Sequence, residues 1–560
     1  MEVLDKPICW LQFNVPHSPR DAHRVNEFSG DLAQSQNPSG GLRIAHYPFY
    51  SGENPGTKTR LPAYPDQGDQ SIMVSECVCN GWRNRWWFRL ALPVLFLACG
   101  LPGVCGVPHS SSDDSRQEID HFLRTLHERG QFNGAILVGD KNGILYEAAF
   151  GQADRPAGTK FTTETQSCLA SVSKPFTALA IMMLVQDGSL RLDDPVSKYV
   201  DGLKEPIASV TIRQLLNHTS GIPDYGNTNI EHPDVTTEEV LHALRTLDHL
   251  EFPQGQQYSY SNSGYVLLGA AVAKASGMPF PQFLSTRILQ PVGMKQTFVL
   301  THEGQKTRGT AKAYNDFGDL DDYAEFVTGD GGMYSTVEDL YLFDRALYRG
   351  SLVTQTTLDE MFTPATVRKG STTYGLGWNI EDTGPGKRVW HTGSTAGFRA
   401  YFERRLANRR VVIMLTNIGN SKRIEISAAI NNILDGSPFT YPKRSGAVEL
   451  EGVYRSSGIA GVLATYQTLK QKSIQDYDLS EGELNTLGYR VLYADHKGAD
   501  AIKVFELNAK EHPSSSNAFD SLAEAYEVNG DTKAAKTNYE RALSLDPTNE
   551  HARTALAKLK

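Results

Sequence analysis

The chain has 560 residues, of which 40% are hydrophobic and 21% are charged. This length exceeds one ordinary domain and predicts about two to four folding units, and the composition excludes disorder over the whole chain. The net charge of −9 argues against a general nucleic-acid-binding protein.

Six cysteines are too few for a disulfide-built scaffold, and they are unevenly distributed. Only Cys168 lies beyond residue 105, and we expect it to be a small buried packing residue. No cysteine or histidine spacing typical of zinc follows it, so we predict a protein without a metal or other cofactor. The other five cysteines are Cys9, Cys77, Cys79, Cys99 and Cys105.

Residues 1–72 are rich in Pro, Gly, Ser, Asn and Gln without a sustained period, which indicates a disordered or spurious upstream extension. Residues 73–117 have the pattern of a signal peptide or lipoprotein-type leader with a polar linker. Three arginines precede the apolar run at residues 90–98, and sequence rich in Gly, Pro and Ser follows it. We therefore expect translation to start at Met73.

Two alternatives for this leader stay open. One alternative to a cleaved signal peptide is a retained membrane anchor, although the apolar run is shorter than the roughly 20 residues of a clean membrane span. The other is a lipid on Cys99, which follows an imperfect lipoprotein-type site. We expect a secreted or periplasmic bacterial protein, with membrane attachment through the leader as the alternative.

A β-hairpin opens the next segment. An apolar run at residues 133–139 leads into an Asn142-Gly143 turn and a return strand from residue 144. The long apolar segment at residues 175–186 predicts a buried helix, which Asp187 and Gly188 end.

Ser171 and Lys174 stand directly before that helix. Positions i and i+3 share a face on a helical turn, so this spacing brings the serine hydroxyl next to the lysine amine. Pro175 fits the first helical turn, which places Ser171 near the positive end of the helix dipole. By itself this spacing is a weak motif, because a solvated helix start has the same pattern.

Two further motifs follow in chain order. Tyr260 and Asn262 lie in a Tyr-Ser-Asn run, and His391, Thr392 and Gly393 form the last motif. Around and after it we predict strands and a closing helix, at residues 388–390, 398–402, 411–416 and 424–434. Strands at both ends of the segment predict a mainly antiparallel sheet.

Together these motifs resemble those of the serine β-lactamase and penicillin-binding-protein superfamily, nearest its class C β-lactamase-related serine hydrolases, which include D,D-peptidases and esterases. The resemblance covers residues 118–436, which we expect to form the hydrolase domain. It implies an α+β fold, with an antiparallel sheet flanked by helices plus a helical domain. It extends to four more stretches: 188–195, 211–225, 329–335 and 374–378.

A serine hydroxyl is a poor nucleophile at neutral pH and needs a base. Lys174 and Tyr260 are the available bases, and because their unperturbed pKa values are roughly 10.4 and 10, the site must lower one of them. We expect the pair to titrate together.

The resemblance implies a role for each motif residue. Ser171 would be the acylated nucleophile, Lys174 its activator and Tyr260 the group that passes the proton to the leaving group. Asn262 would hold Lys174 or the substrate by hydrogen bonds.

The third motif would line the substrate site together with Ser394. The backbone N–H groups of Ser171 and Ser394 would form the oxyanion hole, and Gly393 would let the substrate approach the strand. Many β-lactamases carry Lys where this chain has His391, so the fixed positive charge for a substrate carboxylate is missing. A His-Thr-Gly motif, here His391, Thr392 and Gly393, occurs in the peptidase and esterase branches of the superfamily. This lowers the expectation of efficient β-lactam hydrolysis.

Other noticeable residues have mostly structural interpretations. We expect His218 and Thr219 to form a structural turn, and Trp378 and Trp390 to lie in the core or a cleft wall. Asp224 and Tyr225 are candidates for lining the cleft, and Arg399 is a candidate for the missing charge, although no sequence argument places its side chain there.

An all-α repeat module follows the hydrolase domain. Pro513 and Pro547 are 34 residues apart, and small and large apolar residues align at the same shift. This period predicts two tetratricopeptide-like repeats over residues 484–549, after a linker with a helix at residues 437–483. A groove for a protein partner and a stabilising appendage both fit this module.

The predicted function is that of a serine hydrolase that forms an acyl-enzyme with an ester, a D-amino-acid peptide or a β-lactam. The alternative is a catalytically weak penicillin-binding protein that recognises peptidoglycan peptides and recruits partners through its repeats. The partners are thus a small-molecule or peptide substrate and a protein on the repeats, without nucleic acid.

Overall fold

A computed structural model describes residues 112–559, apart from residues 228–233, 302–308, 325, 366–371 and 384–385. The predicted upstream extension, export signal and lipid attachment at Cys99 lie outside the described residues. Among the helices that can be assessed, none combines the length and apolar character that crossing a membrane requires.

A seven-stranded antiparallel sheet is the centre of the first domain, and its strand order is β2-β1-β12-β11-β10-β9-β8. Strands from both ends of the domain therefore pair, as predicted, with Gly134 of β1 opposite Thr416 of β12. The early hairpin forms because the Asp140 carboxylate accepts the Asn142 N–H at 2.7 Å and closes the turn. The strands are β1 Gly134–Asp140, β2 Gly143–Phe150, β8 Thr373–Tyr374, β9 Asn379–Thr383, β10 Gly386–Thr395, β11 Phe398–Arg405 and β12 Arg410–Thr416.

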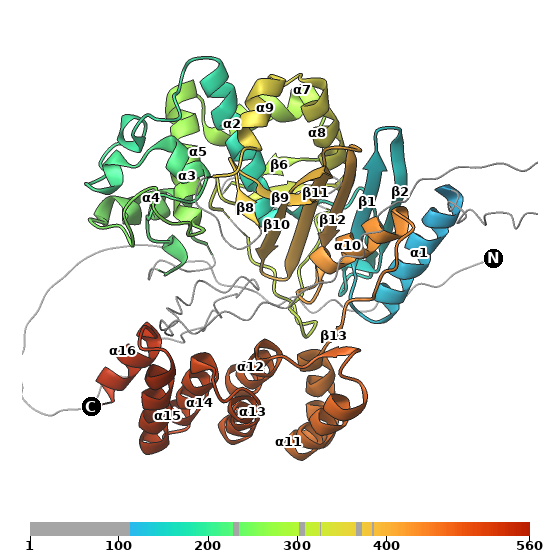
Figure 1. The fold of residues 1–560 in the computed structure, drawn as a ribbon, viewed down its shortest axis with the longest axis vertical. Helices are drawn as coiled ribbons and strands as arrows, with labels where there is room; N and C mark the ends of the chain where they lie inside the picture. Colours follow the sequence, from blue (N-terminus) through green and yellow to red (C-terminus); the bar gives the residue numbers. More distant parts are fainter. Residues whose placement is uncertain are drawn as a thin grey trace, which may run out of the picture. The chain divides into compact units, whose positions relative to one another are not determined.

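Helices cover both faces of this sheet (Figure 1). Alternate residues of β1 point to opposite faces: Ile136 and Val138 join one buried cluster, and Ala135 and Leu137 join another. The first cluster also holds apolar residues of α1 (Ser112–Glu128) and α10 (Arg423–Leu434). The second extends into the helical part of the domain and contains most of the buried helix α2. The α+β fold expected for this domain is confirmed.

The helical part of the domain begins with α2, close to its predicted bounds. Polar caps start several of its helices; at α3, for example, Thr211 and Gln214 satisfy each other's backbone N–H groups. The helices are α2 Lys174–Gln186, α3 Ile212–Leu216, α4 Thr237–Thr246, α5 Asn262–Ser276, α6 Phe280–Leu284, α7 Gln290–Val292, α8 Val337–Arg349 and α9 Gln355–Met361. The short strands are β3 Gln152–Asp154, β4 Thr159–Lys160, β5 Ser167–Cys168, β6 Phe298–Val299 and β7 Met333–Ser335.

Two helices occupy stretches that the sequence indicated to be linkers. α1 begins at Ser112, inside the stretch expected to be a polar linker, because its apolar face packs on the sheet. α11 (Gly446–Lys472) fills much of the predicted linker and changes direction at Gly458, whose φ is 63°. The small strands β13 Arg444–Ser445 and β14 Tyr477–Asp478 pair on either side of it.

The C-terminal module is a series of helical hairpins. The predicted 34-residue shift is visible in the packing, since Ala501 and Ala535 are both fully buried, as are Phe505 and Tyr539. Tyr466 of α11 joins the same core and covers its N-terminal end. The elements are α12 Glu481–Tyr489, the π-helical turn η6 Arg490–Ala494, α13 Gly498–Glu511, α14 Ser516–Val528, α15 Thr532–Leu545 and α16 Glu550–Lys558.

Candidate active site

The nucleophile candidate lies on a short 3-10 turn, η1 (Ala170–Ser173), that runs directly into α2. Lys174 is the first residue of that helix, and its Nζ donates a hydrogen bond to the Ser171 hydroxyl at 3.0 Å. The spacing of three residues thus produces the contact that the sequence predicted, on a 3-10 turn instead of an α-helical one.

The Lys174 side chain is fully buried and is held by oxygen atoms. Besides Ser171, its Nζ donates to the Asn262 side-chain carbonyl at 2.8 Å and to the Asp330 backbone carbonyl at 2.9 Å. A buried ammonium group requires such partners, because desolvation penalises an uncompensated charge. The lysine is therefore fixed in one position beside the serine hydroxyl.

Tyr260 and Asn262 reach this lysine from the start of α5. The Ser261 hydroxyl accepts the Gly264 N–H and begins the helix, which places Asn262 in its first turn. The Tyr260 ring centroid lies 5.0 Å from Lys174 Nζ. The first two motifs, whose Ser171 and Tyr260 are 89 residues apart in the sequence, therefore meet in one site.

His218 lies under Tyr260, with the two ring centroids 4.3 Å apart. It is fully buried, its φ is 59°, and its Nδ1 accepts the Ser261 N–H at 3.1 Å. Burial and the nearby Lys174 charge hold the pKa of His218 well below its usual value, so the ring is neutral. These contacts fit the structural turn expected here.

His391 lies on β10 and is also neutral. Its Nδ1 faces the Thr392 carbonyl at 2.6 Å and must donate, so its Nε2 accepts from the Tyr374 hydroxyl at 2.9 Å. Burial, and then the charge of Lys174, lower the pKa of His391 to about 3. This position therefore supplies no fixed positive charge.

Gly393 has a packing reason that the sequence analysis did not foresee. A Cβ atom at this position would lie 2.0 Å from the Leu169 carbonyl oxygen, which belongs to the segment leading into η1. The chain itself makes a close approach at this glycine. The contact holds the strand of the third motif against the turn that carries Ser171.

An arginine of α10 brings a positive charge to the end of the third motif. Arg423 Nη2 donates to the Ser394 hydroxyl at 2.9 Å, and its buried Nε has no hydrogen-bond partner among the described residues. Desolvation, and then the neighbouring Arg399, lower the pKa of Arg423 to about 9. Arg399, the candidate for the missing charge, is buried, and its Nη1 donates to the carbonyls of Ala396 and Phe398.

A carboxylate network supports the other side of the site. Asp224 accepts the Asn262 N–H at 2.5 Å, and the Tyr225 hydroxyl donates to the buried Asp330 carboxyl at 2.8 Å. Burial raises the pKa of Asp330, and the Lys174 charge opposes that rise. Asp224 and Tyr225, named as candidates for lining the cleft, thus support Asn262 and Asp330.

The structure brings all the predicted site residues into one region: Ser171, Lys174, Tyr260 and Asn262 around the amine, and His391, Thr392, Gly393 and Ser394 along β10. Three neighbours were missed, namely Asp330, Tyr374 and Arg423. The first two lie in stretches that carried the family resemblance, whereas Arg423 stands just before a predicted helix and had no distinguishing pattern. Trp378, Trp390 and Cys168 are buried packing residues.

No group of three or more His, Cys, Asp or Glu side chains within the described residues is arranged to hold a metal ion. What the site does contain is a serine hydroxyl, a buried amine and a phenol on an α+β scaffold. Fold and site together define a serine hydrolase of the β-lactamase type.

Comparison with known proteins agrees with this class. The Beta-lactamase family model matches residues 119–435, and a tetratricopeptide-repeat model matches residues 516–559. The chain therefore belongs to the Beta-lactamase family of serine hydrolases.

Relatives and solved structures span several activities within this fold. A penicillin-binding protein of Bacillus subtilis is 32% identical over 59% of this chain and 78% of its own. A D-aminopeptidase of Brucella anthropi is 28% identical over 50% of this chain and 55% of its own. Among solved structures, a penicillin-binding protein from Bacillus halodurans has a TM-score of 0.51 at 28% identity, covering 56% of this chain and 98% of its own. A D-amino acid amidase from Ochrobactrum anthropi has a TM-score of 0.52 at 26% identity, covering 58% of this chain and 99% of its own.

Proposed function

We propose that this protein hydrolyses D-amino-acid peptides through an acyl-enzyme on Ser171. The observation that carries the proposal is the 3.0 Å hydrogen bond between the Ser171 hydroxyl and the buried Lys174 amine. Ser171 Oγ attacks the acyl carbon, and its proton passes to the Lys174 and Tyr260 pair. The same proton is delivered to the leaving amine as the acyl–nitrogen bond breaks, and water then hydrolyses the ester.

The position of Arg423 favours a substrate with a carboxylate. His391 is neutral, whereas the Arg423 guanidinium is bonded to Ser394 at the end of the same motif. An arginine is well suited to bind a carboxylate, and its pKa of about 9 keeps it charged at neutral pH. D-amino-acid peptides with a free C-terminus and β-lactams carry such a carboxylate, whereas simple esters lack it. Relatives named D-aminopeptidase and D-amino acid amidase also support the choice of a D-amino-acid substrate.

The test combines covalent labelling with turnover. The full chain is incubated with a fluorescent penicillin. Turnover is followed as release of D-alanine from an acylated D-alanyl-D-alanine peptide and as release of D-alanine amide from its C-terminal amide. Labelling and turnover of the free acid are expected in the parent chain, and both should vanish in Ser171→Ala. Ser173→Ala is the matched control, because Ser173 is buried in the same turn and its hydroxyl has no hydrogen-bond partner among the described residues.

Arg423→Gln separates the substrate classes. Loss of a charged hydrogen bond to the carboxylate should lower kcat/KM for the free acid by about tenfold or more and leave the amide unchanged. Labelling without turnover in the parent would instead support the catalytically weak penicillin-binding protein. Absence of labelling and of turnover of peptides and p-nitrophenyl esters would refute the hydrolase.

A further inference from the structure

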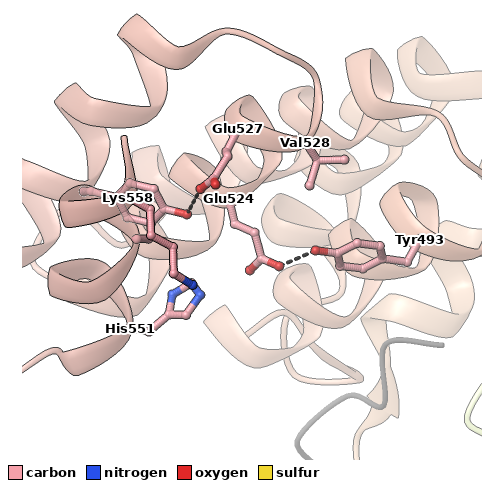
Figure 2. Close-up of a pocket in the computed structure, with 8 residues that line it drawn as sticks. Tyr493, Glu524, Glu527, Val528, His551 and Lys558 are labelled. Atoms are coloured by element: carbon pink, nitrogen blue, oxygen red, sulfur yellow. Dashed lines mark hydrogen bonds between the residues drawn. The ribbon is translucent and has the colours of Figure 1, made fainter. Parts of the chain in front are cut away.

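A pocket in the C-terminal module is built from the first helices of two successive hairpins and from the final described helix, α16. Its volume is about 360 Å³, and its walls come from η6, α14 and α16 together with Tyr539 of α15. Figure 2 draws the residues that line it. This volume lies within the range of roughly 300–1,000 Å³ that small-ligand sites occupy. The pocket is separate from Ser171 and its neighbours and plays no part in the proposed reaction.

Two glutamates of α14 are held in place inside this pocket by tyrosine hydroxyls. Tyr489 donates to Glu524 at 2.7 Å. Tyr493 donates to the other oxygen of the same carboxylate, and Tyr539 donates to Glu527 at 2.8 Å (Figure 2). Each carboxylate oxygen can accept more than one hydrogen bond, so acceptor capacity is left for a ligand. The bonds orient both carboxylates before any ligand arrives, which lowers the entropic cost of binding.

The lining and its immediate neighbours also suit a cation, with Tyr493 and Val528 in the lining and Tyr489 and Asp520 just outside it. The rings of Tyr489 and Tyr493 are stacked 5.9 Å apart, and aromatic faces attract ammonium and guanidinium groups. Val528 is 53% exposed at the rim and offers apolar surface to an alkyl chain. A third carboxylate, Asp520, is paired with His551 at 2.9 Å, and its second oxygen is buried without a hydrogen-bond partner among the described residues.

We propose that this pocket binds a lysine or arginine side chain presented by a basic segment of a protein partner. Carboxylates outnumber cations in and beside the lining: Asp520 is paired with His551, and Lys558, which is exposed at the lip, is the one Lys or Arg that lines the pocket with Glu524 and Glu527. A bare divalent metal fits less well, because it needs several oxygen ligands that are free of the hydroxyl hydrogens directed at them here. The arrangement along successive hairpins suits a side chain of an extended peptide better than a small free amine.

Lys558 gives the proposal a directional test. Its ammonium group occupies the lip of the pocket and repels an incoming cation, so removing it should strengthen binding of a basic peptide. If the pocket instead bound an anion, Lys558 would be the main attraction and its removal would weaken binding.

The experiment measures fluorescence anisotropy with the full chain and a labelled peptide of alternating glycine and lysine. The same peptide with acetylated lysines and a glycine–glutamate peptide are the probe controls, at about 50 and about 300 mM NaCl. The lysine peptide should bind the parent chain, and its affinity should fall as the salt concentration rises. Its affinity for the Glu524→Gln/Glu527→Gln double variant should be about tenfold lower. Lys558→Ala should bind it about threefold more tightly.

Glu506→Gln is the matched control, because Glu506 also accepts a tyrosine hydroxyl, from Tyr526 at 2.9 Å, but lies outside the pocket. The affinity of the Glu506→Gln variant for the lysine peptide should equal that of the parent chain. Penicillin labelling of Ser171 should be unchanged in every variant. Equal affinity in the parent and the folded double variant would overturn the proposal, as would equal binding of the acetylated peptide. Weaker binding by Lys558→Ala, or no binding by the parent, would overturn it too.

Discussion

The two buried histidines near Ser171 are neutral for the same reason. Each ring has lost its hydration and lies near the Lys174 ammonium group, and both effects disfavour a second positive charge. The hydrogen bonds of His391 also fix its tautomer, because one ring nitrogen faces a carbonyl and the other a tyrosine hydroxyl. At this position the chain therefore uses a neutral hydrogen-bonding group, and positive charge is supplied instead by Lys174 and Arg423.

This neutrality predicts a pH dependence of stability. The pKa of His391 is about 3 in the folded chain and about 6.5 when unfolded, so below pH 6.5 the unfolded chain binds more protons. Its contribution to the free energy of unfolding is complete above pH 6.5 and falls by up to about 1.4 kcal/mol per pH unit between pH 6.5 and 3. In His391→Gln, urea unfolding followed by tryptophan fluorescence should show a shallower decline with falling pH.

The control for this measurement is His121→Gln, which replaces an exposed histidine of α1. It should keep the slope of the parent chain. The comparison concerns slopes, so a constant loss of stability in His391→Gln does not affect it. If the free energies of unfolding of both variants fall with decreasing pH at the slope of the parent chain, His391 is not held neutral in the folded chain.

At the scale of elements, the contact between η1 and β10 aligns the nucleophile with the strand of the third motif. In Gly393→Ala the new methyl group would meet the Leu169 carbonyl at 2.0 Å, and the backbone on both sides must shift. We expect a loss of about 1–3 kcal/mol in the free energy of unfolding, as in other overpacked sites. Penicillin labelling should slow by at least about tenfold, because small displacements of reacting groups are costly.

Gly452→Ala is the matched control, since this glycine lies in α11 and a Cβ there has nothing within 4 Å. Alanine should be neutral or stabilising there, by up to about 1 kcal/mol. Unchanged labelling in a folded Gly393→Ala chain would show that the contact does not set the position of Ser171.

Elements with a strong local pattern could be predicted from the sequence. The hairpin followed from an apolar run and an Asn-Gly turn, and α2 followed from its apolar run and glycine end. The contacts that tune the site could not, because they join distant segments. Tyr374 meets His391 only after β8 and β10 enter one sheet, and Arg423 meets Ser394 only after α10 packs on that sheet.

At the scale of the whole molecule, the hydrophobic cores separate the hydrolase domain from the repeats. The two clusters on the sheet include no residue beyond Tyr441 among those described, and the repeat cores include Phe317 as their one described contribution from the hydrolase domain. The remaining contacts are mainly polar, such as the ion pairs of Arg490 with Asp319 at 2.5 Å and of Lys422 with Asp478 at 2.8 Å. These pairs are partly open to solvent, and ion pairs at a protein surface contribute little, about 0–1 kcal/mol each.

Deleting residues 446–560 should therefore leave a folded hydrolase. We expect kcat/KM for a small p-nitrophenyl ester to stay within about twofold of the parent, because no residue of the proposed site lies beyond Arg423. The melting temperature should fall by only a few degrees, about 2–4 °C per kcal/mol lost, as Phe317 and the two ion pairs lose their partners. Activity assays and calorimetry on the shortened and full chains measure both quantities.

The substitution Arg490→Gln in the full chain is the control, since it removes one ion pair and leaves the module in place. Loss of folding in the shortened chain would identify the repeats as a structural part of the hydrolase, whereas retained folding and turnover would favour the partner-binding role.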